Sequence, residues 1–280
     1  MTVPGSAPRS SVARYATLTV GAVLLVGVPL WLVVVSSLKT QPEASALGMA
    51  LPQRWAAAAN YREVVVQSHY LRSLVNSLLV TGASVAALLA VGAPAAWTFA
   101  RSTSRVLRGL YWLSLVGVLL PLPVVPLVYL MREIGLQGTP AGLVLYTIGS
   151  RVSLVVFLMT GFARALPREL EEAAAVDGAS RLRTFRSVVL PIMTPVLRTT
   201  FVILTVLIWN DFFGPMFLLT DQSQATLPLG LYRLSSGVAQ ATAWNFVFTH
   251  VVLVSLPLIV VYLIVQRRIV EGVTAGAVRG

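Results

Sequence analysis

Few side chains in this sequence are of types that carry out chemistry, and their spacing matches no catalytic, metal-binding or phosphate-binding motif. The chain has no cysteine, which excludes thiolate metal sites and a cysteine nucleophile. The two histidines, His69 and His250, have neither HExxH-type spacing nor a second ligand nearby. The single lysine, Lys39, follows a leucine, whereas a P-loop needs a Gly-Lys pair to hold phosphates. We therefore expect a chain that is no enzyme and that holds no cofactor or metal of its own.

Several polar residues lie inside apolar stretches, where they are costly unless they face protein or water. Trp209, Asn210 and Asp211 combine an aromatic face with hydrogen-bonding groups, which would suit a sugar; alternatively, Asp211 caps a helix or pairs with a neighbouring arginine. Arg151 could face a cavity and an anionic solute, or belong to an internal ion pair. His250 is either a proton or solute contact or a packed histidine.

These polar residues interrupt a sequence that is otherwise strongly apolar. Of its 280 residues, 56% are hydrophobic and 11% are charged, and the mean hydropathy is +0.81. The apolar residues gather into six stretches of about 20 residues, the length that a helix needs to cross a bilayer. The stretches span 16–38, 73–100, 110–131, 143–162, 192–219 and 244–265. We therefore predict an all-α polytopic membrane protein with six transmembrane helices within residues 16–266, the first too long for a signal-peptide core.

The arginines predict the orientation, because positive charge is retained on the cytosolic side. With the N-terminus in the cytosol, fourteen of the 21 basic residues lie inside. This arrangement places 1–15, 164–191 and 267–280 in the cytosol and the loop 39–72 outside the cytoplasmic membrane. The net charge of +11 comes mostly from arginines set singly at span ends, where they meet membrane lipids, so it does not indicate nucleic acid.

The cytosolic segment 164–191 predicts two short helices. Pro167 suits the first position of a helix, and Glu169, Glu171 and Glu172 place negative charge where the helix dipole favours it. The apolar side chains expected on one surface of this helix are Leu170, Ala173, Ala174 and Val176.

A turn at Asp177-Gly178 should end the first helix, and Ser180 should cap the second, which Pro191 ends at the membrane. The second helix carries apolar residues among three arginines, namely Leu182, Phe185, Val188 and Val189. Such a pair could enter a cleft on a partner, or it could be an ordinary interfacial hairpin.

The segment closely resembles the EAA loop of permease subunits in binding-protein-dependent ABC importers. The matching residues are Glu172-Ala173-Ala174, Asp177-Gly178-Ala179, Phe185 and Leu190-Pro191, followed by Pro195. The resemblance implies the fold of a type I importer permease, also called MetI-like, and assigns these residues to coupling with a separate ATPase.

Shorter signatures extend the resemblance over nearly the whole chain and point to MalG-like permeases of carbohydrate importers. They are Ser37-Leu38-Lys39, Asn60-Tyr61, Asn76-Ser77-Leu78, Phe99-Ala100-Arg101, Leu120-Pro121, Pro126-Leu127, Trp209-Asn210-Asp211 and Pro215. The tail also matches, and the resemblance implies that Gln266, Arg267, Thr274, Gly276 and Gly280 contact the ATPase.

The resemblance implies a subunit that translocates a sugar across the cytoplasmic membrane and does not hydrolyse ATP. The implied partners are a second, MalF-like permease, an ATP-binding subunit dimer that holds ATP and Mg²⁺, and an extracytosolic sugar-binding protein. Glycerol phosphate or a polyol is an alternative solute. A secondary transporter is the alternative mechanism, although the sequence has no convincing inverted repeat and no chain of intramembrane carboxylates. An intramembrane enzyme or a channel subunit has less support still.

Overall fold

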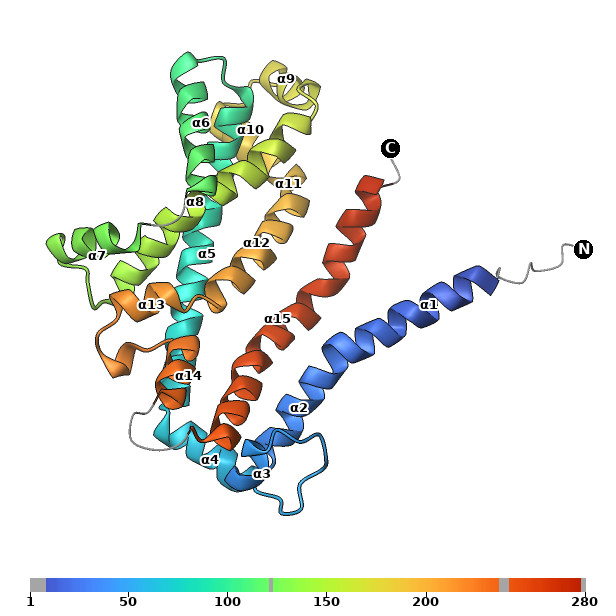
Figure 1. The fold of residues 1–280 in the computed structure, drawn as a ribbon. Coiled ribbons are helices and arrows are strands. Elements are labelled where there is room, and N and C mark those ends of the chain that lie inside the picture. The colour runs from blue at the N-terminus through green and yellow to red at the C-terminus, as the bar shows by residue number, and fades with distance from the viewer. Residues whose placement is uncertain (1–8, 121–122, 237–241, 278–280) are drawn as a thin grey trace, which may run out of the picture. The chain divides into compact units, whose positions relative to one another are not determined.

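The computed structural model describes residues 9–120, 123–236 and 242–277, and the regular structure in these ranges is helical (Figure 1). The N-terminal helices are α1 (Arg9–Ala22), the π turn η1 (Val23–Gly27), α2 (Val28–Ser37), α3 (Gln41–Ser45) and α4 (Ala57–Gln67). Next come α5 (Tyr70–Arg101), α6 (Arg105–Leu119), α7 (Val124–Glu133), α8 (Pro140–Ala165) and α9 (Glu169–Val176). The remaining elements are α10 (Arg181–Thr184), the π turn η2 (Phe185–Val189), α11 (Leu190–Ile192), α12 (Thr194–Trp209), α13 (Phe213–Leu218), the short 3₁₀ turn η3 (Gln222–Gln224), α14 (Leu227–Ser235) and α15 (Trp244–Ala277).

The predicted all-α membrane fold is confirmed. Four helices in the described ranges are long and apolar enough to cross a bilayer, covering Arg14–Ser37, Tyr70–Arg101, Pro140–Ala165 and Trp244–Ile264. Two further candidates are bent pairs, so the described chain has up to six spans if each pair crosses as one.

The stretch 110–131 is not one straight helix, as its hydropathy had suggested. It is divided between α6 and α7, which are inclined at 116° to each other. The sequence places Pro121 and Pro123 between the two helices, and proline supplies no backbone N–H to continue a helix. Hydropathy reports that a stretch is apolar, whereas the bend depends on where N–H donors are missing.

The stretch 192–219 also differs from the predicted single span. Its main helix, α12, ends at Trp209, and a separate helix, α13, begins at Phe213. In the last span the apolar part ends at Ile264 as expected, but α15 continues to Ala277. No break therefore separates the final span from residues 267–277 of the predicted tail.

The described chain divides into two compact units, the first formed by residues up to Tyr70 and by 231–256. Within it, a buried asparagine joins three helices. Asn60 Nδ2 donates to the carbonyl oxygens of Ser37, at 2.9 Å, and Lys39, at 2.8 Å. Asn245 Nδ2 in turn donates to Asn60 Oδ1 at 2.8 Å. The carbonyls at the end of α2 are thereby satisfied, as a helix end buried from water requires.

His250 lies in the same unit and is fully buried. Its ring meets the ring of Tyr70 edge to face, with centroids 6.1 Å apart, and the Tyr70 hydroxyl donates to the Leu253 carbonyl at 2.9 Å. Of the two roles considered for His250, this environment fits the packed histidine.

The second unit comprises residues 71–230 and 257–280, and its core is built on α5, α8 and α12. Gly92 on α5 allows α8 to approach closely, because a Cβ atom there would lie 2.3 Å from Val155 Cγ1. Small residues at such crossings are typical of helices that pack in membranes. The buried core side chains include Val85, Leu88, Ala96, Val155, Met159, Leu204 and Ile208.

The start of α5 holds the segment that precedes α14. Asn76 Nδ2 donates to the carbonyl oxygens of Ser223, at 3.0 Å, and Ala225, at 3.1 Å. Ser77 Oγ accepts a hydrogen bond from Leu227 N at 2.8 Å. The Asn76-Ser77 signature therefore satisfies backbone groups of a segment far away in the sequence.

Replacement of Asn60 by alanine should destabilise the protein, because its buried partner groups would remain without hydrogen bonds, at a cost of about 1–3 kcal/mol for each group. The thermal unfolding midpoint in detergent should fall clearly for Asn60→Ala. It should stay unchanged for Ser45→Ala, which removes an exposed hydroxyl that donates to Gln41 O within the same short helix. Equal midpoints for both variants would contradict the role assigned to Asn60.

Candidate functional site

The segment between α8 and α12 contains both predicted helices. Arg168 precedes α9 in a helical conformation, so Pro167 lies just before the helix. The three glutamates occupy the first turn of α9, as predicted, where their charge favours the helix. The first helix of the EAA loop is thus confirmed over Glu169–Val176.

The turn after α9 has the geometry of a Schellman motif. Gly178 has φ +75°, its N–H donates to the Ala175 carbonyl at 3.0 Å, and the Ala179 N–H donates to the Ala174 carbonyl at 2.9 Å. These two bonds satisfy carbonyls at the helix end. A Cβ atom on Gly178 would meet nothing within 4 Å in the described structure. The glycine therefore suits this position because of its left-handed backbone and not because of tight packing.

The second helix begins where predicted but does not end at Pro191. Ser180 caps it, its Oγ accepting from Arg183 N at 3.4 Å. Helical structure then continues through α10, η2 and α11 to Ile192, and the chain bends by 71° before α12. The turn η2 is a π turn in which Leu190 N donates to Phe185 O. A widened turn accommodates Pro191, which has no N–H to offer the preceding turn.

The outer surface of α9 is open. None of its residues is buried, Glu172 and Ala173 are exposed, and Val176 is 87% exposed. Of the residues predicted to form a narrow apolar surface, Leu170, Ala173 and Val176 are exposed, whereas Ala174 is half-buried. The arrangement presents a small-residue surface on a helix whose C-terminal end is fixed by capping and whose first turn carries the three glutamates.

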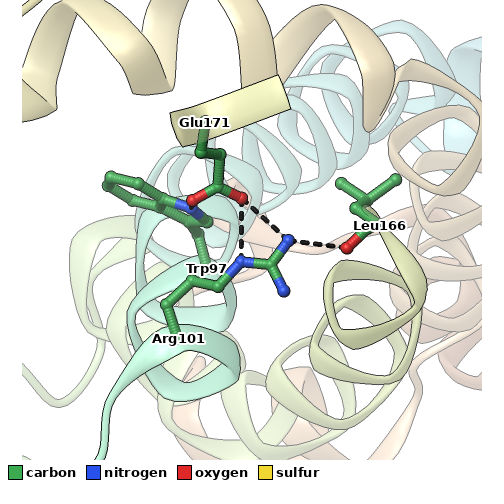
Figure 2. Close-up of polar contacts among 4 residues, drawn as sticks. All are labelled: Trp97, Arg101, Leu166 and Glu171. Carbon is green, nitrogen blue, oxygen red and sulfur yellow. Dashed lines mark hydrogen bonds and ion pairs between the residues drawn. The ribbon is translucent and has the colours of Figure 1, made fainter. Parts of the chain in front are cut away.

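Glu171 faces the other way and is held by two residues of α5 (Figure 2). Arg101 Nε and Nη2 each lie 2.8 Å from Glu171 Oε1, and Trp97 Nε1 donates to Oε2 at 3.0 Å. Arg101 Nη2 also donates to the Leu166 carbonyl at 2.9 Å. The carboxylate and guanidinium side chains are only 17% and 16% exposed, so solvent screens the pair weakly. Hydrogen bonds to charged groups of this kind contribute about 1.5–3 kcal/mol each.

Trp97 extends the same contact to the second helix of the loop. Its ring packs against Phe185 of η2 with centroids 5.4 Å apart. Trp97 and Glu171 did not stand out as functional residues in the sequence, and Arg101 did so only as a span end. A usable signal was present, because Trp97 and Arg101 are four residues apart and share one face of a helix.

A cavity of about 500 Å³ lies beside these residues. Its walls include Arg101 and Glu171, the turn between α5 and α6, and Arg181 and Thr184 of α10. The loop is therefore separated from the α5–α6 turn by open space at this point, while Glu171 joins it directly to α5.

The predicted solute-path residues are only partly brought together. Trp209 and Asp211 line a cavity of about 10 Å³, which has room for a water molecule and not for a sugar. Asp211 Oδ1 accepts a hydrogen bond from Gly214 N, in the first turn of α13, at 3.2 Å, which is the kind of contact that the helix-capping alternative expects. Asn210 Nδ2 donates to the Val206 carbonyl at 2.8 Å, one turn back on α12.

Arg151 and Asp211 both lie in the described part of the chain but form no ion pair there, although such a pair was one of the expected arrangements. The Arg151 Nε atom is buried without a hydrogen-bond partner among the described residues. A Cβ atom on Gly214 would lie 2.5 Å from Tyr146 Cε1 and 3.0 Å from Asp211 Oδ2, so Tyr146 and Asp211 border the same space.

The predicted tail contacts lie largely outside the described structure. Gln266, Arg267, Thr274 and Gly276 belong to α15, but their side chains are not among those described. Gly280 lies outside the described residues altogether. The tail's contact with an ATPase stays a prediction.

Comparison with solved structures defines the class of the fold. The chain is similar to a chain of a bacterial ABC transporter involved in the import of the acidic polysaccharide alginate, with a TM-score of 0.81 and 21% identity. The similarity covers 95% of this chain and 99% of the other. The chain therefore has the fold of that transporter chain.

Sequence comparison gives the family. Residues 69–274 match the family model of the binding-protein-dependent transport system inner membrane component, and the chain belongs to this family. It is 29% identical to the diacetylchitobiose uptake system permease NgcG of Streptomyces coelicolor, over 97% of this chain and 90% of that protein. It is 30% identical to the trehalose transport system permease SugB of Mycobacterium tuberculosis, over 94% of this chain and 95% of that protein.

Replacement of Gly178 by valine should open the turn after α9, because a left-handed backbone costs a side-chain-bearing residue about 1–2 kcal/mol, and more for one branched at Cβ. Trypsin should then cut the detergent-purified protein faster at the exposed Arg181 and Arg183. Gly178→Asn should be cut at nearly the native rate, since asparagine tolerates this conformation.

The matched control is Gly149→Val, at an exposed helical glycine of α8 where an added Cβ atom would meet nothing within 4 Å in the described structure. It should leave the cleavage rate of the loop unchanged. Equal protection of Gly178→Val and the native chain would show that the positive φ does not matter.

Proposed function

We propose that this chain is the permease subunit of an ATP-driven importer that translocates a sugar delivered by an extracytosolic binding protein. A separate ATP-binding subunit docks on the α9 loop, on the cytosolic side, and supplies the energy. A second, related permease completes the membrane domain. ATP and Mg²⁺ are held by the ATPase and not by this chain.

The observation that carries the docking proposal is the outer surface of α9. Ala173 and the largely exposed Val176 form an open surface of small side chains beside the exposed Glu172. Hydrogen bonds fix the C-terminal end of α9, and the charge of its first-turn glutamates favours its N-terminal end. A rigid helix with small outward side chains can enter a cleft closely and with little loss of conformational entropy. Its match to the EAA pattern supports the ATP-binding subunit as the partner.

The orientation follows from the arginines. The segment from 164 to 186, which contains α9 and α10, carries five arginines, and segments rich in positive charge are retained in the cytosol. Both chain termini are then cytosolic, and the tail that includes Gln266 and Thr274 lies on the side where the ATPase docks.

A sugar as the solute is supported by the relatives, which are named for the uptake of diacetylchitobiose and trehalose. Trp209, Asn210 and Asp211 remain the proposed contribution of this chain to the path, with Arg151 on the adjoining helix. Because Trp209 is 4% exposed and the cavity beside it holds about 10 Å³, rearrangement of α12 and α13 or the second permease must supply the room for a sugar.

Replacement of Ala173 by phenylalanine should uncouple ATP hydrolysis from transport, because the larger side chain prevents close docking of α9. The complex of both permeases, the ATPase and the binding protein, reconstituted in liposomes, should lose solute-stimulated ATPase activity by about tenfold or more, as expected for an interface contact of about 1.4 kcal/mol or greater. Ala86→Phe, at an exposed position of α5, is the matched control. Native stimulation in Ala173→Phe would contradict docking through this surface.

The energy source and solute can be tested in the same liposomes. Uptake should stop when vanadate traps the ATPase and should persist when the proton gradient is collapsed; the reverse result would indicate a secondary transporter. The binding protein should stimulate ATP hydrolysis more when it is loaded with diacetylchitobiose, trehalose or maltose than when it is loaded with glycerol phosphate. Stimulation by glycerol phosphate alone would exclude a sugar importer.

A further inference from the structure

The last turn of α5 contacts three segments of the loop. Arg101 contacts the chain after α8 through the Leu166 carbonyl and contacts α9 through Glu171. Trp97 contacts α9 through the same carboxylate and contacts η2 through the Phe185 ring. Three separate pieces of the loop therefore meet on two side chains of one span.

We propose that Trp97, Arg101 and Glu171, here called the Glu171 cluster, transmit the movement of α9 to the span α5. The proposal rests on the proposed docking of the ATPase on α9. It assigns to these three residues a positioning role, distinct from the docking contacts made by Glu172 and Ala173.

The geometry of the Glu171 carboxylate suits a rigid link. Both of its oxygens accept hydrogen bonds, Oε1 from two nitrogens of Arg101 and Oε2 from Trp97 Nε1. Donors on both oxygens fix the orientation of the carboxylate as well as its distance from α5, because hydrogen bonds weaken steeply when they are misaligned. A purely apolar contact, such as that of Trp97 with Phe185, resists sliding much less.

The two neighbouring carboxylates show that this arrangement is particular to Glu171. Glu169 and Glu172 lie in the same helical turn, are exposed, and form no ion pair with a described residue. The helix α9 thus directs one carboxylate inward to α5 and leaves Glu172 on the surface proposed for docking.

The cavity beside the cluster makes the link important. Open space of about 500 Å³ lies between the loop and the α5–α6 turn, so close packing does not carry displacement across that side. On this side, a force applied to α9 reaches α5 through Glu171. Loss of the cluster should therefore separate ATP hydrolysis from solute movement without preventing the ATPase from docking.

The test uses Glu171→Ala, Arg101→Ala and the double variant in the reconstituted complex. The readout is solute imported per ATP hydrolysed, with whichever of diacetylchitobiose, trehalose and maltose is most active with the native complex. Each single variant should lower this ratio about tenfold, and the double variant should lower it no further than the worse single one, because residues acting as a unit are not additive. Trp97→Phe keeps a ring against Phe185 but loses the N–H donor and should lower the ratio about threefold.

Glu169→Ala is the matched control, since it removes an exposed carboxylate of the same turn, and it should retain the native ratio. Variants that assemble poorly, but whose assembled complexes keep the native ratio, would show that the cluster only supports the loop's fold and would overturn the proposal. Additive losses in the double variant would also overturn it. If the native chain recruits no ATPase, the proposed function itself fails; if the native complex is active and the variants match it, only this inference fails.

Discussion

The constraint on which the structure depends is the need to satisfy every backbone N–H and C=O group where water is scarce. Inside a helix the backbone does this itself, so polar side chains are needed where helices end. Asn60 performs this task at the end of α2, Asn76 at the segment before α14, and Asp211 between α12 and α13. Several short signatures of this family thus supply the side chains that form hydrogen bonds with backbone groups at helix ends. Their spacing in the sequence reflects where the helices end more than which solute is transported.

The EAA loop is built to have two different faces. Its two helices are fixed where they meet, by the Schellman turn at Gly178 and by the Ser180 cap, which depend only on neighbouring residues. Its outer face stays open, and its inner face is held to α5 by Arg101 and Trp97, which contact Leu166, Glu171 and Phe185. A loop that is rigid within itself but attached at a few points can move as a body, which is what transmission between a motor and a membrane domain requires.

The helices of the loop and the positions of most spans could be predicted, because they depend on residues that are close together in the sequence. The two loop helices followed from the glutamates, Gly178 and Ser180, and the spans followed from runs of apolar residues. Hydropathy did not predict that the helices end after Leu119 and Trp209, because it measures composition and not the supply of backbone N–H donors. Pro123 and the Gly214-Pro215 pair were the residues in the sequence that could have indicated these breaks. The contact between Arg101 and Glu171 was missed for another reason. These residues are 70 positions apart, and no periodicity within one segment identifies which partner a charged side chain will meet.

The π turn η2 has a consequence for how the loop can change shape. It contains one residue more than an α turn would need. It begins at Phe185, which packs on Trp97, and it ends two residues before Pro191, which cannot donate a hydrogen bond. Conversion of this turn to α geometry would rotate the residues on one side by about 100° relative to the other. Such a rotation would carry Phe185 away from Trp97. The extra residue therefore determines how the residues on one side of η2 are rotated relative to those on the other side. The contact between Phe185 and Trp97 maintains this rotation.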